Sequence, residues 1–260
     1  MSQNFDPNQN YYFFNKKNSI PIVFIHGVGL DHQMWDYQIN YFNEYSTLTY
    51  DLLGHGKTPY NKDKLSLRDF SDQLLKILDY LKIEKINLIG FSLGSLIALD
   101  FSSHFQKKVE KLILIGTTYK RSDEERSLVL DRYNQAKLNK PISKQALKRW
   151  FNDKYLEDNP ETYDLFIRIL NKEPKDHKNF LKAYELFANH IDDVAAIKKI
   201  DQKTLVMTGS DDVGSTPAMS KELVKDLVNS TYIEIQNGKH LCSIECVDDV
   251  NISIKNFINN

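Results

Sequence analysis

Residues 86–101 read INLIGFSLGSLIALDF, and this stretch decides the fold class. Its first residues are apolar, as in a buried strand, and apolar residues continue as in a buried helix from Leu93 onward. Between them, Gly90-Phe91-Ser92-Leu93-Gly94 fits the pattern G-x-S-x-G. Either Ser92 caps the following helix, or a sharp strand-to-helix turn holds it out as a nucleophile. The strand and the helix lie where the second interpretation needs them, so the sequence favours a nucleophile.

Strand-like and helix-like segments alternate on both sides of this stretch. We expect buried strands at 20–25, 46–50, 86–90, 109–115, 204–208 and 231–235, and an antiparallel edge strand at 11–16. We expect helices at 33–43, 67–81, 93–104 and 246–258. Near-continuous apolar strands separated by helices are typical of an α/β protein with a mostly parallel central sheet and helices on both faces.

This alternation stops after the fourth of these strands. No convincing strand pattern occurs between residues 117 and 197, where four amphipathic segments follow one another. Pro141, Pro160 and Pro174 fall between these segments, as helix boundaries do. The sequence therefore predicts a core domain made of residues 1–117 and 196–260, interrupted by an all-helical cap at 118–195.

Composition limits the classes of partner and location. The chain has 260 residues, 41% of them hydrophobic, with 34 basic and 35 acidic residues. This balance gives no reason to expect nucleic acid or a membrane as a partner. The polar first residues lack the apolar core of a signal peptide, and no run is long enough to span a bilayer, so we expect a cytoplasmic protein. Cys242 and Cys246 are expected to be reduced thiols, since their spacing fits no zinc site.

A serine nucleophile needs a base and a carboxylate that orients the base. Of the seven histidines, only His240 follows the last expected strand, in a loop before the final helix. The loop after the preceding strand, TGSDDVGSTP at 208–217, carries Asp211 and Asp212. Since parallel strands bring such loops to one edge of the sheet, one carboxylate is expected to orient His240. The residues alone leave open which of the two it is.

The reaction also needs N–H donors for a developing oxyanion. The strand at 20–25 runs into His26-Gly27-Val28-Gly29, where glycines let the backbone approach a substrate. The backbone N–H groups of Val28 and Leu93 are the expected donors. No metal ion or organic cofactor is required by this chemistry.

Five motifs together resemble the enzymes of the α/β-hydrolase fold. They are FIHGVG (24–29), YDLLGHGKT (50–58), GFSLGS (90–95), TGSDD (208–212) and GKHL (238–241). The resemblance implies a Ser-His-Asp triad of Ser92, His240 and Asp212, because the acid in similar proteins stands three residues after the loop glycine, here Gly209. It also implies that Val28 donates to the oxyanion and that the turn from Asp51 to Gly56 is structural. A serine at position 92 is unlike the haloalkane dehalogenase and epoxide hydrolase branches, which use a carboxylate nucleophile.

Within that fold, the segments 148–166 and 240–258 look most like 3-oxoadipate enol-lactonases and their carboxylesterase relatives. The expected function is therefore hydrolysis of a small-molecule ester or lactone through an acyl-enzyme. The alternatives are a C–C bond hydrolase, a thioesterase, a cofactor-free perhydrolase or haloperoxidase side activity, and a non-catalytic small-molecule receptor. The sequence does not predict the oligomeric state.

The cap is expected to select the substrate. The proposed substrate-binding residues are Tyr133, Arg149, Trp150 and Phe151, from a larger aromatic set that includes Tyr155, Tyr163, Phe166, Tyr184 and Phe187. Most aromatic residues on such helices only pack the helices together. The cap arginines are Arg126, Arg132, Arg149 and Arg168. If the substrate is 3-oxoadipate enol-lactone, at least one of them must point inward to bind a carboxylate.

Overall fold

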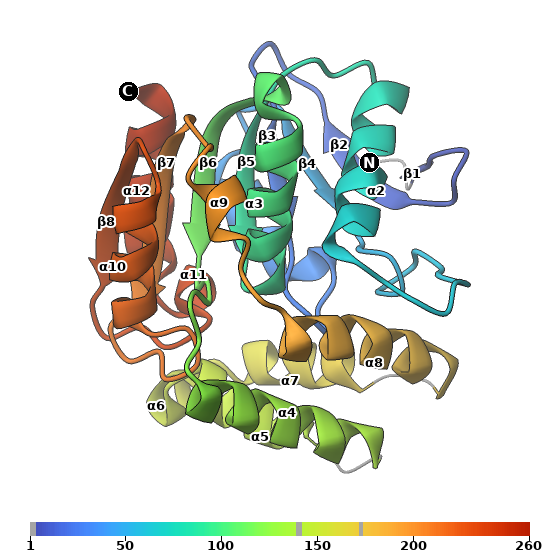
Figure 1. Ribbon diagram of the computed structural model, residues 1–260, viewed down its shortest axis with the longest axis vertical. Helices are drawn as coiled ribbons and strands as arrows, with labels where there is room; N and C mark the ends of the chain where they lie inside the picture. The colour runs from blue at the N-terminus through green and yellow to red at the C-terminus, as the bar shows by residue number, and fades with distance from the viewer. Residues whose placement is uncertain (1–3, 139–141, 172–173) are drawn as a thin grey trace.

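A single mixed sheet forms the centre of the protein. The computed structural model describes residues 4–138, 142–171 and 174–260. Within these residues the sheet has the order β1-β2-β4-β3-β5-β6-β7-β8 (Figure 1). Its strands are β1 (Asn4–Phe5), β2 (Tyr11–Asn15), β3 (Ile22–Ile25), β4 (Thr47–Tyr50), β5 (Ile86–Phe91), β6 (Val109–Ile115), β7 (Lys203–Gly209) and β8 (Ser230–Ile235). The sheet is parallel from β4 to β8, as the sequence predicts.

The antiparallel pairing of β2 is confirmed, and two details of the strands near the N-terminus differ from expectation. β2 pairs with β4 on one side and with the short strand β1 on the other, and β1 was not predicted. β3 begins at Ile22 and not at Ile20, because Pro21 has no N–H to donate to the sheet and Ile20 is exposed.

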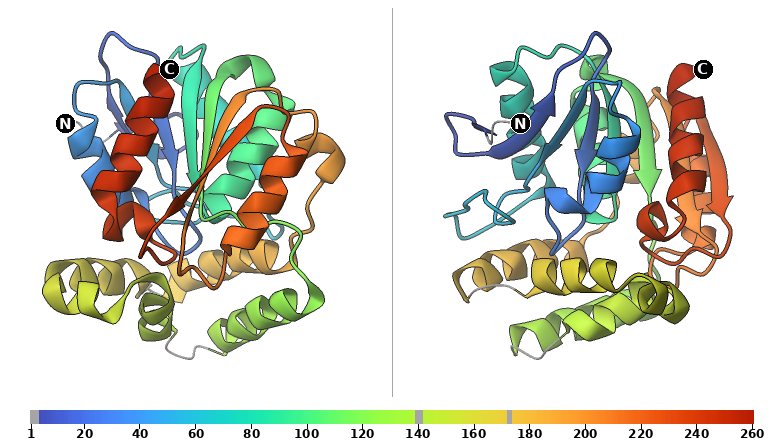
Figure 2. Two further views of the ribbon diagram at one scale, coloured as in Figure 1. Left: turned by 90° about the vertical axis from the view of Figure 1, so that its left-hand side faces the viewer. Right: turned by 180° about the vertical axis from the view of Figure 1, so that it is seen from behind.

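Helices cover both faces of the sheet. Those of the core are η1 (His32–Trp35), α1 (Asp36–Tyr41), α2 (Leu67–Tyr80), α3 (Leu93–His104), η2 (Gln106–Lys108), α9 (Val194–Ile197), α10 (Pro217–Asp226), α11 (Cys242–Glu245) and α12 (Val247–Asn259). Figure 2 shows α12 on one side of the sheet and α10 with α3 on the other. No helix in the described ranges combines the length and apolar character that crossing a membrane would take.

Successive side chains of a strand point to opposite faces of the sheet, so a strand such as β3 contributes to a hydrophobic cluster on both faces. In β3, Val23 and Ile25 pack in the cluster that includes the α2 and α3 side chains. Ile22 and Phe24 pack in the opposite cluster, with residues of α1, α11 and α12. All four side chains are fully buried. At about 1.5–3 kcal/mol for each large apolar side chain, this burial on both faces explains why the strand reads as a continuous apolar run.

Between β6 and α9 the described residues form five helices, which lie across the carboxyl ends of the strands, at the bottom of Figure 1. We call them the cap helices: α4 (Asp123–Lys137), α5 (Ser143–Trp150), α6 (Asp153–Asp158), α7 (Pro160–Leu170) and α8 (Pro174–Asn189). Pro160 and Pro174 begin α7 and α8, as expected, whereas Pro141 lies outside the described residues.

The break between α5 and α6 was not predicted, because the pattern at 144–156 reads as one helix. Phe151 is extended (ψ 153°) and fully buried, and the Asn152 N–H donates to Glu245 Oε1 at 2.8 Å. Contacts with the loop and helix after β8 therefore end α5 at Trp150.

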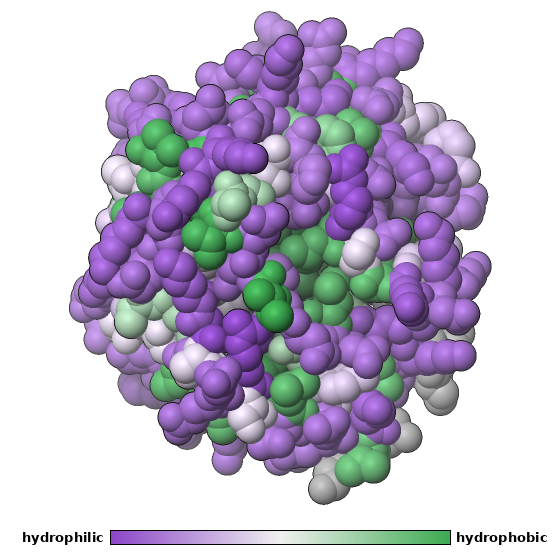
Figure 3. Space-filling view, viewed as in Figure 1, coloured by the Kyte–Doolittle hydropathy of each residue, from purple (hydrophilic) through white to green (hydrophobic). Residues whose placement is uncertain are grey.

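The surface of the face seen in Figure 1 is largely hydrophilic, with hydrophobic residues gathered around a hollow near its middle (Figure 3). On this face a groove between α3 and α9 is lined by Leu96, Leu99 and Ile197. The carboxylates at its rim are already paired, since Asp100 accepts from Ser71 and Asp193 caps α9. The groove is separate from the pocket at the strand ends described next.

Candidate active site

Ser92 occupies a strained turn between β5 and α3. Its backbone has φ 53° and ψ −115°, a conformation that costs an L-residue roughly 1–3 kcal/mol. Although Ser92 is the residue before α3, its side chain makes no capping hydrogen bond to the helix. The helix-cap interpretation is therefore wrong.

The glycines around Ser92 permit a close approach of backbones. A Cβ atom added at Gly94 would lie 2.3 Å from the carbonyl oxygen of Ile25, and one added at Gly90 would lie 2.3 Å from that of Gly94. Both distances are far inside van der Waals contact. The pattern G-x-S-x-G is thus required by the packing of α3 against β3 and β5 at this turn.

His240 lies between Ser92 and an aspartate. Its Nε2 is 3.2 Å from Ser92 Oγ, and its Nδ1 is 2.6 Å from Asp212 Oδ2. The other carboxylate oxygen of Asp212 accepts the N–H groups of Gly214 and Ser215 at 2.8 and 2.9 Å. Asp212 is buried, whereas Asp211 is exposed and accepts from the Ser210 hydroxyl. Of the two aspartates, it is Asp212 that contacts His240.

These contacts determine what His240 can do. An ionised carboxylate only accepts hydrogen bonds, so Nδ1 carries the proton that points at Asp212. In the neutral ring Nε2 is then unprotonated, and its lone pair faces the Ser92 hydroxyl. The arrangement allows His240 to take a proton from Ser92 while Asp212 balances the charge that forms on the ring.

Neighbouring side chains confine the imidazole ring. The rings of Phe91 and Trp150 lie 4.8 and 6.3 Å from it, centroid to centroid. Gly116 adopts φ +59°, and a Cβ atom there would lie 3.3 Å from the ring. His240 is thus held by packing as well as by Asp212, and a side chain at position 116 would disturb it.

The two expected oxyanion donors lie beside Ser92. Leu93 is the first residue of α3, and Val28 is in a turn in which the Leu30 N–H donates to the Gly27 carbonyl oxygen at 3.2 Å. Gly29 provides the positive φ (77°) that such a turn needs at its third position. Neither the Val28 nor the Leu93 N–H donates a hydrogen bond to another described residue. Val28 lines the pocket, whereas Leu93 is not among the lining residues and is adjacent to Ser92, which lines it, so both remain candidate donors.

A pocket of about 100 Å³ opens above Ser92 and His240. The loops at the strand ends contribute Val28, Ser92, Thr118, Asp212, Val213, Gly214, Ser215 and His240. The cap helices contribute Val129, Arg132, Arg149, Trp150, Tyr184 and Phe187. The pocket thus has one wall from the core and one from the cap helices.

Two of the four expected substrate-binding residues, Arg149 and Trp150, line this pocket. Tyr133 and Phe151 do not, so their assignment is corrected. Phe151 is fully buried and stacks on Tyr155, and Tyr133 packs edge-to-face against Tyr184. Both belong to the packing of the cap helices.

Of the cap arginines, Arg132 and Arg149 line the pocket. Arg126 instead donates to the carbonyl oxygens of Arg121 and His190, and Arg168 is outside the lining. The sequence did not single out Val129, Thr118 or the loop at 213–215. Val129 and Arg132 share one face of α4 at i, i+3 spacing, but spacing alone does not tell which face of a cap helix looks inward.

Positive charge accumulates on the cap wall of the pocket. Burial lowers the pKa of Arg149, and the charge of Arg132 lowers it further. Burial raises the pKa of Tyr184, while the charges of both arginines offset part of that rise. Neither guanidinium forms an ion pair with a carboxylate of the described residues. Two cations without a carboxylate partner, in the pocket that Ser92 also lines, make this wall suited to an anionic group.

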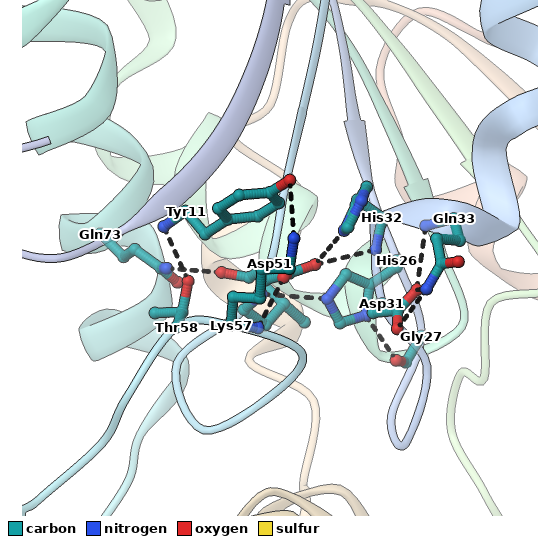
Figure 4. A network of polar contacts seen from close by, with 11 residues as sticks. Tyr11, His26, Gly27, Asp31, His32, Gln33, Asp51, Lys57, Thr58 and Gln73 are labelled. Atoms are coloured by element: carbon teal, nitrogen blue, oxygen red, sulfur yellow. Dashed lines mark hydrogen bonds and ion pairs between the residues drawn. The ribbon is translucent and has the colours of Figure 1, made fainter. Parts of the chain in front are cut away.

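A second polar cluster includes His26, Asp31, His32 and Asp51 (Figure 4). Asp31, His32 and Asp51 place potential metal-ligand atoms within 4.8 Å of one another. The Asp51 carboxylate, however, accepts the His32 N–H, the His32 ring and the Lys57 N–H, and that of Asp31 accepts from Gln33. The lone pairs that a metal would need are used by N–H donors, so the cluster is a hydrogen-bond network.

The His32–Asp51 pair should make stability depend on pH. Burial alone would lower the pKa of His32, but the hydrogen bond to Asp51 and the charges of Asp51, Asp31 and Asp36 raise it above the usual 6.5. Burial would raise the pKa of Asp51, but the same bond and charge lower it below the usual 3.8. His32, whose pKa is raised, stabilises the fold fully below pH 6.5 and loses this effect as pH rises through its folded pKa. Asp51, whose pKa is lowered, stabilises the fold above pH 3.8 and loses this effect as pH falls through its folded pKa.

We therefore expect His32→Asn, which keeps a donor for Asp51 but cannot be charged, to lose more stability at about pH 5.5 than at about pH 8. The loss in free energy of unfolding caused by His32→Asn should be about 1 kcal/mol larger at the lower pH, which is the difference between a charged and a neutral hydrogen bond. Urea unfolding of both proteins at the two pH values measures this. The exposed His104→Asn serves as the control, and a pH-independent difference for His32→Asn contradicts the expectation.

Comparison with known proteins places this geometry in a family. The family model of the alpha/beta hydrolase fold matches residues 20–245. An (E)-2-((N-methylformamido)methylene)succinate hydrolase of Acinetobacter baylyi is 29% identical over 255 residues, covering 96% of this chain and 95% of the relative. The 3-oxoadipate enol-lactonase 2 of the same organism is 26% identical, covering 91% and 87%. The enol-lactonase structure from Burkholderia xenovorans LB400 has the same fold, with TM-score 0.87 at 23% identity and coverage of 97% and 98%. Since the family model spans most of its length, the chain belongs to the α/β-hydrolase fold family.

Proposed function

We propose that this protein is a serine hydrolase that cleaves a carboxylic ester or lactone of a small molecule through an acyl-enzyme on Ser92. The observation that carries the proposal is the hydrogen-bonded series Asp212–His240–Ser92 at the floor of a pocket. Each member has the partner that its role requires. The strained backbone of Ser92 supports a role in chemistry, because no cap or fold contact of its side chain explains it.

In the first half-reaction, Ser92 Oγ attacks the substrate carbonyl carbon while its proton moves to His240 Nε2. The carbonyl oxygen becomes an oxyanion, which the Val28 and Leu93 N–H groups bind, each contributing about 3 kcal/mol. The bond from the carbonyl carbon to the leaving oxygen then breaks, and His240 gives that oxygen its proton. The product is an acyl-enzyme and an alcohol, which stays attached to the acyl group when the substrate is a lactone.

In the second half-reaction, a water molecule attacks the acyl carbon and transfers a proton to His240 Nε2. When the bond to Ser92 Oγ breaks, this proton returns to Oγ and the carboxylic acid leaves. Asp212 remains ionised throughout and stabilises the imidazolium in both halves. The Gly214 and Ser215 N–H groups keep its carboxylate in the orientation that His240 needs.

We further infer that the cap helices select the substrate and that the substrate carries a carboxylate remote from the scissile bond. Arg132 and Arg149 lie in the pocket without a carboxylate partner among the described residues, and their mutual repulsion would be relieved by an anion. Val129, Trp150 and Phe187 supply an apolar surface for the part between this anion and the carbonyl. Two relatives are named for derivatives of succinate and 3-oxoadipate, which are carboxylic acids.

The substrate preference can be tested with paired aryl esters. Wild-type protein should hydrolyse a p-nitrophenyl monoester of succinate with a lower KM than p-nitrophenyl butyrate, which is neutral and of similar length. Arg132→Gln and Arg149→Gln should each raise KM for the anionic ester by about 10-fold or more, since a charged hydrogen bond is worth about 1.5–3 kcal/mol. The neutral ester should be affected far less.

Arg168→Gln, on a cap helix but outside the pocket, is the matched control. Equal effects of the pocket substitutions on both esters would refute the carboxylate assignment and leave the ester hydrolase intact. Absence of ester and lactone hydrolysis by the wild type would refute the hydrolase itself. In that case turnover of a diketone would favour the C–C bond hydrolase, and ligand binding without turnover would favour the receptor.

A further inference from the structure

We propose that His26 is a positioning residue that fixes the orientation of the Val28 N–H, so that this group is aimed at the oxyanion before substrate arrives. The inference rests on the proposed acyl transfer and adds a residue to it. His26 is fully buried, directly follows β3, and is not among the described residues that line the pocket. We expect its effect on the reaction to pass through the loop that follows it.

The partners of His26 define its protonation (Figure 4). The Leu52 N–H lies 2.9 Å from Nε2, and a backbone N–H can only donate, so Nε2 carries no proton. Nδ1 lies 2.8 Å from the Gly27 carbonyl oxygen, which can only accept, so Nδ1 carries the proton. The ring is thus a neutral bridge that accepts from one loop and donates to another.

The donated bond acts on the peptide group that contains the Val28 N–H. Gly27 C=O and Val28 N–H belong to the same planar unit, and in a trans peptide they point in opposite directions. No cis peptide occurs among the described residues. Holding the Gly27 oxygen against Nδ1 therefore holds the Val28 N–H on the opposite side, where Val28 lines the pocket. Rotation of this peptide would move the donor away from the oxyanion.

The accepted bond ties His26 to a rigid part of the fold. Leu52 follows Asp51, whose carboxylate accepts three N–H groups. The Asp51 carbonyl oxygen accepts from Gln73 Nε2 at 2.9 Å, and Gln73 Oε1 accepts the Leu53 N–H at 3.1 Å. The turn at 51–53 is thereby fixed on both sides of Leu52. The Leu52 N–H therefore holds the His26 ring in a fixed position.

Two substitutions separate the donated bond from the accepted one. In asparagine the amide nitrogen is bonded to Cγ, as Nδ1 is in histidine, so His26→Asn keeps a donor for Gly27. In glutamine the terminal oxygen reaches the place of Nε2, so His26→Gln keeps an acceptor for Leu52 and loses the donor. Because loss of an oxyanion donor costs about 10²- to 10³-fold in kcat, we expect His26→Gln to lower kcat by about 10- to 100-fold, with KM little changed. His26→Asn should stay within about threefold of wild type.

We would measure kcat and KM on the ester that wild-type protein hydrolyses best, together with the melting temperature. We would also measure the affinity for an arylboronic acid, because its adduct on Ser92 places an oxygen at the oxyanion position. His26→Gln should weaken the boronate by the same factor as kcat, and the surface control His104→Gln should change neither. Equal losses of kcat in the two His26 variants, or an unchanged kcat in His26→Gln, would overturn the proposal while wild-type turnover still upheld the hydrolase.

If both variants fail to fold, the intact protein still decides the question. Long-range ¹H–¹⁵N NMR spectra distinguish the two neutral tautomers of a histidine. The proposal requires His26 to be protonated at Nδ1 only. A ring protonated at Nε2 would leave the Gly27 oxygen with the Leu30 N–H as its remaining donor, at 3.2 Å, and would overturn the inference without any substitution.

Discussion

Ser92→Ala is expected to lower kcat for ester hydrolysis by about 10⁴- to 10⁶-fold, as removal of a triad serine does in other hydrolases. Among the described residues that line the pocket, the Ser92 hydroxyl is the nucleophile candidate within hydrogen-bond distance of His240 Nε2. Residual hydrolysis would come from water activated by His240 and from the oxyanion donors. Steady-state kinetics on the p-nitrophenyl esters measures the loss.

The substitution should leave folding unaffected. Ser92 Oγ makes no capping contact, and alanine meets the same backbone strain as serine at φ 53°. The melting temperature should therefore stay within about 2 °C of wild type. Ser103→Ala, on the same helix and far from the pocket, should keep full activity. An alanine variant that folds and retains activity within about tenfold of wild type would refute Ser92 as the nucleophile.

Asp212→Asn is expected to lower kcat by about 10⁴-fold, whereas Asp211→Asn should change it less than about threefold. The reason is the direction of the hydrogen bonds. The Gly214 and Ser215 N–H groups require an acceptor, so the asparagine oxygen must face them and its NH₂ group must face His240 Nδ1. A donor there pairs only with an unprotonated Nδ1. The ring proton then sits on Nε2, where it prevents His240 from accepting the proton of Ser92.

The adjacent aspartates make this a stringent comparison. Asp211 carries the same charge one residue away but is exposed, and the side-chain hydrogen bond it accepts within the described residues comes from Ser210. If the acid acted by its field alone, both substitutions would reduce kcat by similar factors. Measuring kcat of both variants from about pH 6 to about pH 9 distinguishes the two cases. Similar losses of kcat in the two variants would contradict the assignment of Asp212.

The sheet and the floor of the site could be read from the sequence because local patterns encode them. Ile22 to Ile25 alternate between two buried faces, which produces a continuous apolar run. Gly90 and Gly94 are required because a Cβ atom at either position would lie 2.3 Å from a backbone carbonyl oxygen. The choice between Asp211 and Asp212, in contrast, needed the family resemblance or the structure, because both are acidic residues in one turn.

The cap helices were less predictable, because their faces are chosen by packing between segments. Phe151 looked suited to the pocket, but the Asn152–Glu245 contact ends α5 and turns Phe151 into the core. Arg132 and Arg168 are both arginines on amphipathic helices, and only the arrangement of α4, α5 and α8 brings Arg132 beside Arg149. The break after Trp150 and the short strand β1 likewise depend on partners distant in the sequence.

The central claim is that Ser92 carries the acyl group during turnover, and trapping that species tests it most directly. The protein would be mixed with an excess of an aryl ester, quenched in acid within the pre-steady-state burst, digested, and analysed by mass spectrometry. The account predicts one acyl group per chain, located on Ser92 and absent from Ser92→Ala. Continuous ester turnover without an adduct, or with the adduct on another residue such as Cys246, would contradict it.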